Sequence, residues 1–519
     1  MNCGRLPCDE AQVLSRPQER AAIGRGTWVL AATVLGSSMD FIDGTVVNVA
    51  LPALQTDLHA SGVQAQWVVV GYALFLSSLL LVGGALGDRL GLRRIFLAGV
   101  VSFAAASVWC GVAPKIGQLI AARCLQGVGG ALLVPSSLAL LSANFSDEQR
   151  GKAIGTWSGF ASAMTALGPV LGGWLVQHGS WRWVFFVNVP LAVLAIWIVL
   201  LNVPPGPQKD LRAGLQGMDW LGAALATGGL SGIVFALIEC SQRSPLVWIA
   251  GAAGVVLLAA ALLVEKRASS PLLPLGLFRS RNFLGANLLT FFLYGAFGGA
   301  LYYLPLNLIQ IQRYSATRAG AAMLPAVLLM FFLSRWSGGL LSRYGARLPL
   351  IVGPLLAALG FALLARPGVG GSYWTTYFPA AVVLGLGMTV SVAPLTTVVL
   401  SSVEAGRTGI ASAVNNAMSQ VAALMALAVF APVFFAVFAP SLSRGLERNG
   451  ASQEVVQQVV AQRDKLGAIV TSDARGRAAV DEAYITAFRV VVLLAAGLAA
   501  AASASAAITL TKHCEKHQG

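Results

Sequence analysis

The sequence predicts an all-α polytopic membrane protein with fourteen transmembrane helices, arranged as two six-helix halves with two further helices between them. Three observations support this fold class. The 519 residues are 56% hydrophobic and only 11% charged, whereas a soluble domain carries about 25% charged residues. The apolar runs are continuous and about 20 residues long, as membrane-spanning helices require, and do not alternate as barrel strands do. A charged motif between two apolar runs recurs in degraded form later in the chain.

The apolar runs give the expected spans in chain order. They lie at 27–53, 67–87, 95–113, 117–143, 153–177, 183–203, 218–239, 246–264, 283–309, 319–341, 348–366, 375–400, 408–438 and 483–510. We therefore expect an N-terminal tail (1–26), a first half (27–203), a linker with two extra helices (204–282), a second half (283–510) and a C-terminal tail (511–519). The first apolar run is too long for the apolar region of a cleavable signal peptide, so we expect none.

Loop charges predict the orientation. An even number of spans puts both termini on one side. If that side is the cytoplasm, the inner loops and tails hold 20 Lys and Arg residues and the short outer loops hold 6. Positive charge in short loops marks the cytoplasmic side. We therefore expect a bacterial-type plasma-membrane protein with both termini inside, and the net charge of +14 needs no nucleic-acid partner.

One outer loop, 439–482, is long. Its valines at 455, 456, 459 and 460 have helical spacing. The loop either forms a small amphipathic hairpin over the outer face or is a solvated loop with a weak helix.

The recurring motif divides the chain into two halves. Its first copy is 84–94 (GALGDRLGLRR) and its second is 339–347 (GLLSRYGAR), with Ser342 where the first copy has Asp88. The copies are 254 residues apart when these two positions are aligned, which suits eight helices. Two six-helix halves with an inserted pair account for this spacing, and repeated halves are typical of transporters with a midplane substrate site.

Two acids lie inside the first span. Asp40 and Asp43 are three residues apart and share one face of the helix. An acid within the membrane is costly and indicates a functional site. Such a carboxylate can hold either a proton or a cationic substrate, which is a basis for exchange. The alternative is a structural acid paired with a neighbouring helix.

Several motifs together resemble one known family. The loop 84–94, Arg123–Gly130 (RCLQGVGG) on the fourth span and Gly168–Gly173 (GPVLGG) on the fifth resemble the major facilitator superfamily and its antiporters. Asp43–Pro52 (DGTVVNVALP), Trp181–Pro190 (WRWVFFVNVP) and Asp219–Gly222 (DWLG) are similar to its fourteen-helix drug:proton antiporter family. This resemblance, which covers nearly the whole chain, implies the major facilitator fold.

The resemblance also implies residue roles. Arg123 takes part in proton coupling with Asp43 and Asp40, unless it is only a structural partner. Gly168, Pro169, Gly172 and Gly173 carry no ionisable group, so their role is steric: they seal the cavity during switching or simply pack tightly. Gly84, Gly91, Asp88, Arg89 and Arg93 form a gating latch, with Asp88 pairing to Arg89, Arg93 or a helix N-terminus. The family pattern has a basic residue where this chain has Leu92.

Further polar residues lie in or near the spans. The candidates for lining a substrate cavity are Gln126, Asn415, Asn416, Gln420 and Arg335. The alternative for the amides is hydrogen bonding between helices. Arg335 either snorkels to the cytoplasmic surface or faces the cavity. Glu239, at the end of an extra helix, is expected at the membrane interface.

These features predict a proton-coupled antiporter that exports amphipathic small molecules by alternating access. A proton-coupled importer on the same fold is the alternative, and a polytopic membrane enzyme is a remote one. No HExxH, GxSxG or Walker A motif occurs. We expect no enzyme activity, no metal and no cofactor, a proton gradient as the energy source, and a monomer in the bilayer.

Overall fold

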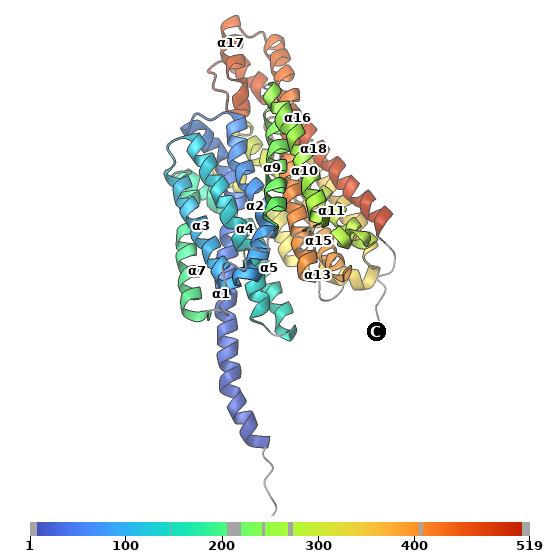
Figure 1. Cartoon of the computed structure of the whole chain (residues 1–519). Helices are drawn as coiled ribbons and strands as arrows, with labels where there is room; N and C mark the ends of the chain where they lie inside the picture. The colour runs from blue at the N-terminus through green and yellow to red at the C-terminus, as the bar shows by residue number, and fades with distance from the viewer. Residues whose placement is uncertain are drawn as a thin grey trace, which may run out of the picture.

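A computed structural model describes residues 8–145, 147–204, 219–240, 244–267, 273, 275–403 and 408–510. Within these ranges, fourteen helical segments are long and apolar enough to cross a membrane. The polypeptide forms a helical bundle in two halves, with the inserted pair at its flank and a small helical cap at one end (Figure 1). The predicted all-α class and the number of spans are confirmed.

The first half contains six spans. Its helices are α1 (Cys8–Asp57), α2 (Gly62–Leu90), α3 (Leu92–Val112), α4 (Ile116–Ala143), α5 (Asp147–His178), and the short α6 (Trp183–Phe186) followed by α7 (Asn188–Asn202). A capping box between Ser61 and Gln64 begins α2. Gly91 separates α2 from α3 with a φ of 102°, a backbone conformation that favours glycine.

The second half repeats the arrangement. Its helices are α11 (Arg281–Leu306) with the π-helical turn η3 (Asn307–Ile311), α12 (Ala316–Ala321) with α13 (Leu324–Tyr344), α14 (Arg347–Leu363), α15 (Tyr373–Ser401), α16 (Thr408–Arg448) and α18 (Ala474–Thr509). In the first half α1 packs on α5 and α7, and α4 packs on α2 and α3. In the second half α11 packs on α16 and α18, and α15 packs on α13 and α14. The equivalent neighbours support two six-helix repeats.

The inserted pair is a helical hairpin. It consists of α9 (Trp220–Ile238), which Asp219 caps through the amide of Gly222, and α10 (Pro245–Arg267). The short η2 (Leu275–Arg279) leads from there into α11. Helix α9 contacts both α2 and α16, so the pair lies beside the line where the two halves meet. The Trp67 indole donates a hydrogen bond of 3.0 Å to Glu239, so Glu239 contacts α2 at the end of α9.

The long outer segment is largely helical. Helix α16 continues to Arg448, and α18 begins at Ala474, so the irregular part is shorter than the predicted loop at 439–482. Between them lie α17 (Gln453–Ala461) and η5 (Arg463–Ala468), at the top of Figure 1. Val459 is fully buried and the other three valines pack against the core. The segment therefore forms the packed hairpin and not the solvated loop.

This cap touches the other half of the protein. The backbone of Asp464 and the side chain of Leu466 lie against Gly62, at the start of α2. Arg477 holds the cap in place, because its guanidinium donates to the carbonyls of Gly467 and Ile469 in the cap and of Gln310 in η3.

The two halves join at the end of the bundle that carries the cap. Gln310 donates to Gln55 over 2.9 Å, and Gln66 donates to the carbonyl of Leu427 over 3.0 Å. Thr317 donates to Gln177 over 2.8 Å. Each of these hydrogen bonds connects the first half to the second.

Candidate functional site

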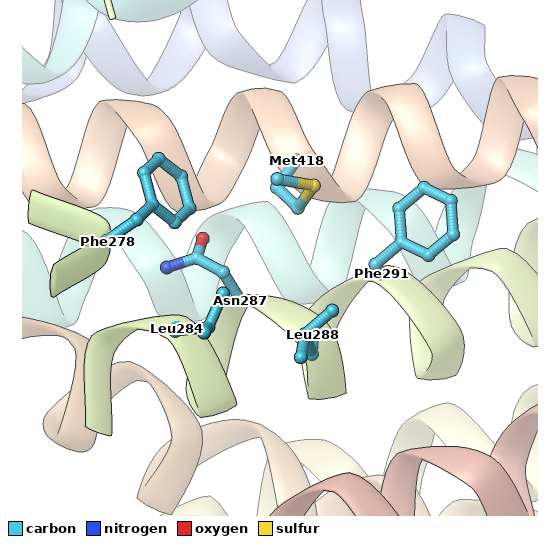
Figure 2. A pocket seen from close by; sticks show the side chains of 6 residues that line it. All are labelled: Phe278, Leu284, Asn287, Leu288, Phe291 and Met418. Atoms are coloured by element: carbon cyan, nitrogen blue, oxygen red, sulfur yellow. The ribbon is translucent and has the colours of Figure 1, made fainter. Parts of the chain in front are cut away.

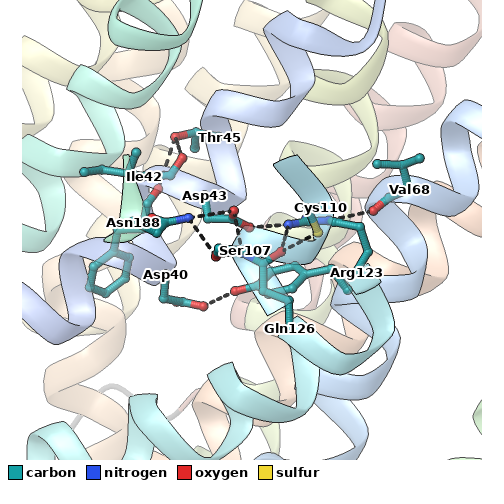
Figure 3. A network of polar contacts seen from close by, with 12 residues as sticks. Asp40, Ile42, Asp43, Thr45, Val68, Ser107, Cys110, Arg123, Gln126 and Asn188 are labelled. Carbon is teal, nitrogen blue, oxygen red and sulfur yellow. Dashed lines mark hydrogen bonds and ion pairs between the residues drawn. The ribbon is translucent and has the colours of Figure 1, made fainter. Parts of the chain in front are cut away.

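A buried polar network lies inside the first half, where α1, α2, α3, α4 and α7 meet (Figure 3). At its centre, Arg123 of α4 donates to Asp43 of α1 at 2.5 Å. The Asp43 side chain is fully buried and Arg123 is 1% exposed. A buried charge requires a partner with good geometry and further hydrogen bonds. The network supplies both.

Three more polar side chains surround this ion pair. Gln126 donates to Asp43 (2.8 Å) and to Ser107 (2.9 Å), and its oxygen accepts from Arg123 (2.7 Å). Asn188 donates to Asp43 (3.3 Å) and to Ser107 (3.2 Å). All three surrounding side chains are completely buried. Asp43 thus accepts hydrogen bonds from three donors on two other helices.

Arg123 is fixed from two further sides. Its Nε donates to the carbonyl of Val68 on α2 over 2.9 Å. Its guanidinium carbon lies 4.3 Å from the centre of the Tyr72 ring, in the range of a cation–π contact. These contacts hold the cation in one position in the interior of the bundle.

Asp40 forms a separate contact one helical turn away. Its Oδ1 accepts a hydrogen bond from the Tyr72 hydroxyl. Asp40 is 6% exposed and Tyr72 is 5% exposed. Tyr72 therefore bonds Asp40 directly. Its ring also lies against Arg123, which is the ion-pair partner of Asp43.

The glycines of the fourth span explain how these helices come so close. A side chain at Gly127 would collide with the backbone of Tyr72 on α2, and one at Gly129 with the backbone of Phe103 on α3. Gly130 lies beside the Asp40 carboxylate and the Tyr72 hydroxyl. Because small residues permit close helix approach, this run lets Arg123 reach across to α1 and α2.

The structure unites the predicted coupling residues and adds others. Asp43, Asp40 and Arg123 belong to one region, as their predicted role in proton coupling requires. Gln126, which we expected on a cavity wall, is fully buried inside the network. Tyr72 and Ser107 had no sequence signal, because isolated tyrosines and serines are common in spans. Asn188 lay in the motif 181–190, whose intramembrane position could have indicated it.

The same motif also closes one end of the first half. Trp181 and Arg182 donate to Asp57, at 2.8 and 3.0 Å. Arg182 also donates to the carbonyl of Ala113 and lies over the Trp181 ring. These contacts tie the end of α1 to the segment that precedes α7.

The fifth-span motif lies between α1 and the other half. A side chain at Gly168 would meet Thr45, and one at Gly172 would meet Val46, both on α1. Gly173 faces the backbone of Ala316 and Thr317 on α12. The motif is therefore a smooth surface with contacts to both halves, and Pro169 lies within it.

The predicted latch residues lie at the end of α2 and the start of α3. Asp88 is exposed, and Arg89 is half-buried. Arg93 donates to the carbonyls of Val199 (3.4 Å) and Leu200 (3.3 Å) on α7, so it contacts its own half. Gly84 lies beside Pro135 of α4. The latch remains a prediction, and the side chain of Ser342 in the second copy lies outside the described residues.

The remaining cavity candidates lie on two helices of the second half. Asn415 donates to Asn287 (3.2 Å) and Thr290 (2.7 Å) on α11, so it joins two helices. Asn416 is exposed and Gln420 is half-buried. The side chain of Arg335 lies outside the described residues, and its predicted role stays open.

A small cavity lies next to Asn415. It has a volume of about 220 Å³ and lies between η2, α11 and α16 (Figure 2). Its lining is apolar except for one amide and consists of Phe278, Leu284, Asn287, Leu288, Phe291 and Met418.

The chain thus has two repeated halves, an inserted helix pair and a buried polar network. Known proteins share its sequence pattern. The family model described as Major Facilitator Superfamily matches residues 33–427. The chain belongs to the major facilitator superfamily. Proteins of this superfamily transport solutes, so this major facilitator protein is a transporter and not an enzyme, and the predicted family is confirmed.

Three curated relatives of this major facilitator protein are named for resistance. It is 35% identical over 438 residues to the tetracenomycin C resistance and export protein of Streptomyces glaucescens, covering 81% of this chain and 78% of the relative. It is 38% identical to the puromycin resistance protein pur8 of Streptomyces alboniger, covering 78% and 81%. It is 34% identical to the methylenomycin A resistance protein of Bacillus subtilis, covering 78% and 86%.

Solved structures share the fold of this major facilitator protein. A bacterial homologue of the human lysosomal transporter Spinster, in an inward-facing and unoccupied conformation, matches with a TM-score of 0.64 at 18% identity. The match covers 93% of this chain and 97% of that one. The transporter PepTSo of the POT family matches with a TM-score of 0.61 at 17% identity, covering 94% and 99%.

Proposed function

We propose that this protein is a proton-coupled antiporter that exports amphipathic small molecules from the bacterial cytoplasm by alternating access. It works as a monomer in the plasma membrane and draws on the proton gradient without a cofactor. The observation that carries the proposal is the buried pair of acids, Asp40 and Asp43, with Arg123 between α1, α2 and α4. Ionisable groups inside a membrane protein are costly and typical of proton pathways.

The relatives support the substrate class. Their names refer to tetracenomycin C, puromycin and methylenomycin A, and each is a resistance protein. We infer export of such compounds, with the transported molecule itself unassigned.

The predicted orientation determines which side of the membrane the closed end of the bundle faces. With both termini in the cytoplasm, the cap and the contacts between the halves face outward. The bonds from Gln310 to Gln55 and from Gln66 to Leu427 then close the outer face. In this reading the protein is inward-facing, the state in which an exporter takes up its substrate.

The test uses the purified protein in liposomes with an imposed pH gradient. The probes are ethidium, which is permanently charged and so is not trapped by pH alone, and puromycin. An antiporter accumulates the probe when the lumen is acidic, because outward proton flow drives inward probe flow. An importer that carries protons with its substrate accumulates the probe only when the outside is acidic.

Two controls make the outcome specific. Protein-free liposomes measure passive entry of each probe. The variant Glu447→Gln changes an exposed acid in α16 and should transport at the wild-type rate. Probe uptake that ignores the pH gradient would remove the proton-coupling proposal, and uptake only from an acidic outside would favour import.

A further inference from the structure

We propose that Asp40, and not Asp43, is the acid that takes up and releases the transported proton, and that Tyr72 reports its protonation to Arg123. This inference rests on the proposed function, since it assigns the proton of that antiport cycle to one carboxylate. The argument comes from the different partners of the two acids, which lie on one face of α1 (Figure 3).

Asp43 is built to remain a carboxylate. Its Oδ2 accepts from Arg123, and its Oδ1 accepts from Gln126 and Asn188. Three donors thus already occupy most of the lone-pair positions of this carboxylate, and Arg123 cannot give up its own proton because guanidinium stays charged in proteins. Protonation of Asp43 would therefore leave a buried cation without its counter-charge, which is strongly unfavourable.

Asp40 can hold a proton without loss of its hydrogen bond. Its Oδ1 accepts from the Tyr72 hydroxyl, and a hydroxyl is both a donor and an acceptor. When the carboxylate gains a proton from water, the new carboxyl O–H donates to the Tyr72 oxygen, and the Tyr72 hydroxyl hydrogen rotates away. No covalent bond of Tyr72 breaks, and the site gains one positive charge in total. The reverse rotation accompanies release of the proton to water.

The surroundings of Asp40 leave room for this exchange. Asp40 retains 6% of its surface, whereas Asp43 has none exposed. A side-chain carbon at Gly130 would lie 3.5 Å from Asp40 Oδ1 and 3.4 Å from the Tyr72 oxygen. Gly130 therefore borders this hydrogen bond directly.

The charged and titratable groups near Asp40 are Tyr72 on α2, Arg123 on α4 and Asp43 on its own helix. Helices α5 and α7 also pack on α1, and the described polar side chains that they bond to the network here are Trp157, bonded to Ser37, and Asn188. Neither of these side chains titrates. Among the side chains that the structure describes, Asp40 therefore faces one cation, and the Tyr72 ring and hydroxyl lie between them.

Tyr72 provides the link to the ion pair. Its ring face lies 4.3 Å from the Arg123 guanidinium, and its hydroxyl bonds Asp40. Donation to a carboxylate increases the electron density of the ring, which strengthens attraction of a cation to the ring face. Protonation of Asp40 reverses that bond and weakens this attraction. The change reaches Arg123, whose hydrogen bonds to other helices go to Asp43 on α1 and to the carbonyl of Val68 on α2.

The experiment compares Asp40→Asn with the double variant Asp43→Asn/Arg123→Gln, which removes both charges of the buried pair and so preserves neutrality. Puromycin is added to each purified protein in weakly buffered detergent solution, and proton release is measured. Puromycin exchange between the two sides of proteoliposomes is measured from pH 5.5 to 8.5. Glu447→Gln is the control.

Asp40→Asn should release at least ten-fold fewer protons, and its exchange should become independent of pH while exchange itself persists. The double variant should still release protons, because Asp40 and Tyr72 are intact, but its exchange should be slower, because Tyr72 then lacks the Arg123 cation. Tyr72→Phe should retain proton release but exchange more slowly. A folded Asp40→Asn protein with wild-type proton release and pH profile would overturn the inference, as would loss of proton release in a folded double variant. Absence of proton release in the wild type would instead refute the proposed antiport.

Discussion

Gly320 of α12 lies directly against the carbonyl of Pro169 on α5, so two helices from opposite halves touch backbone to backbone. Gly173 of α5 makes the reciprocal contact with Ala316 of α12. Small residues at such contacts allow helices to separate and return without side chains to interlock. The fifth-span motif is thus one side of an interface, and its other side comes from a segment that the sequence did not single out.

This contact predicts the effect of a larger residue at position 320. Gly320→Leu should hold α12 away from α5 and weaken closure at the cap end, reducing transport at least ten-fold. Spin labels at the exposed positions His178 and Arg318 should show a longer distance in the variant. The matched control is Gly497→Leu, because Gly497 is exposed with open space around it. An unchanged label distance together with normal transport would contradict the prediction.

The contact between the cap and α2 predicts that the cap moves during transport. Cysteines at Gly62 and Leu466, whose side chains would lie within contact distance, should form a disulfide under oxidation. With the other cysteines replaced, the cross-linked protein should lose most of its transport, because the cap then cannot leave the first half. A reducing agent should restore it.

Each single-cysteine variant is the control for this experiment, and both should transport with or without oxidant. If the cross-linked protein transports as well as its reduced form, the cap does not need to separate from α2.

The buried ion pair predicts an unequal response to single and double substitution. Asp43→Asn alone leaves the Arg123 cation buried without its counter-charge, which costs about 3–5 kcal/mol of stability. Thermal unfolding of the detergent-solubilised protein should therefore show a clear fall in Tm for Asp43→Asn. The double variant with Arg123→Gln should recover part of that loss. A double variant less stable than either single variant would indicate that the two residues do not act as a pair.

Much of the fold follows from the sequence, because length and apolarity of the spans carry the information. The two acids on α1 could also be recognised, since charge inside an apolar run is rare. Tyr72 and Ser107 could not. In a membrane both lipid-facing and core-facing surfaces are apolar, so periodicity does not reveal which face of α2 or α3 meets the acids.

The contacts between the halves were also beyond the sequence. Gln55 and Gln310 lie 255 residues apart. In the sequence, each is simply a polar residue near a helix end and predicts no contact. Gln310 lies in the π-helical turn at Asn307–Ile311, which sets its position. No sequence motif predicts this turn. Similarly, Glu239 was expected only as an interfacial acid, and its bond to Trp67 depends on how the inserted pair docks.

The hydrogen bonds that join the halves at the cap end come from glutamine amides, one hydroxyl and a backbone carbonyl. Bonds between neutral groups are little affected by dissolved ions, whereas attraction between exposed charges is screened. This seal therefore holds with similar strength in dilute and in saline surroundings. The closure of this end of the bundle should therefore depend little on the salt concentration of the medium.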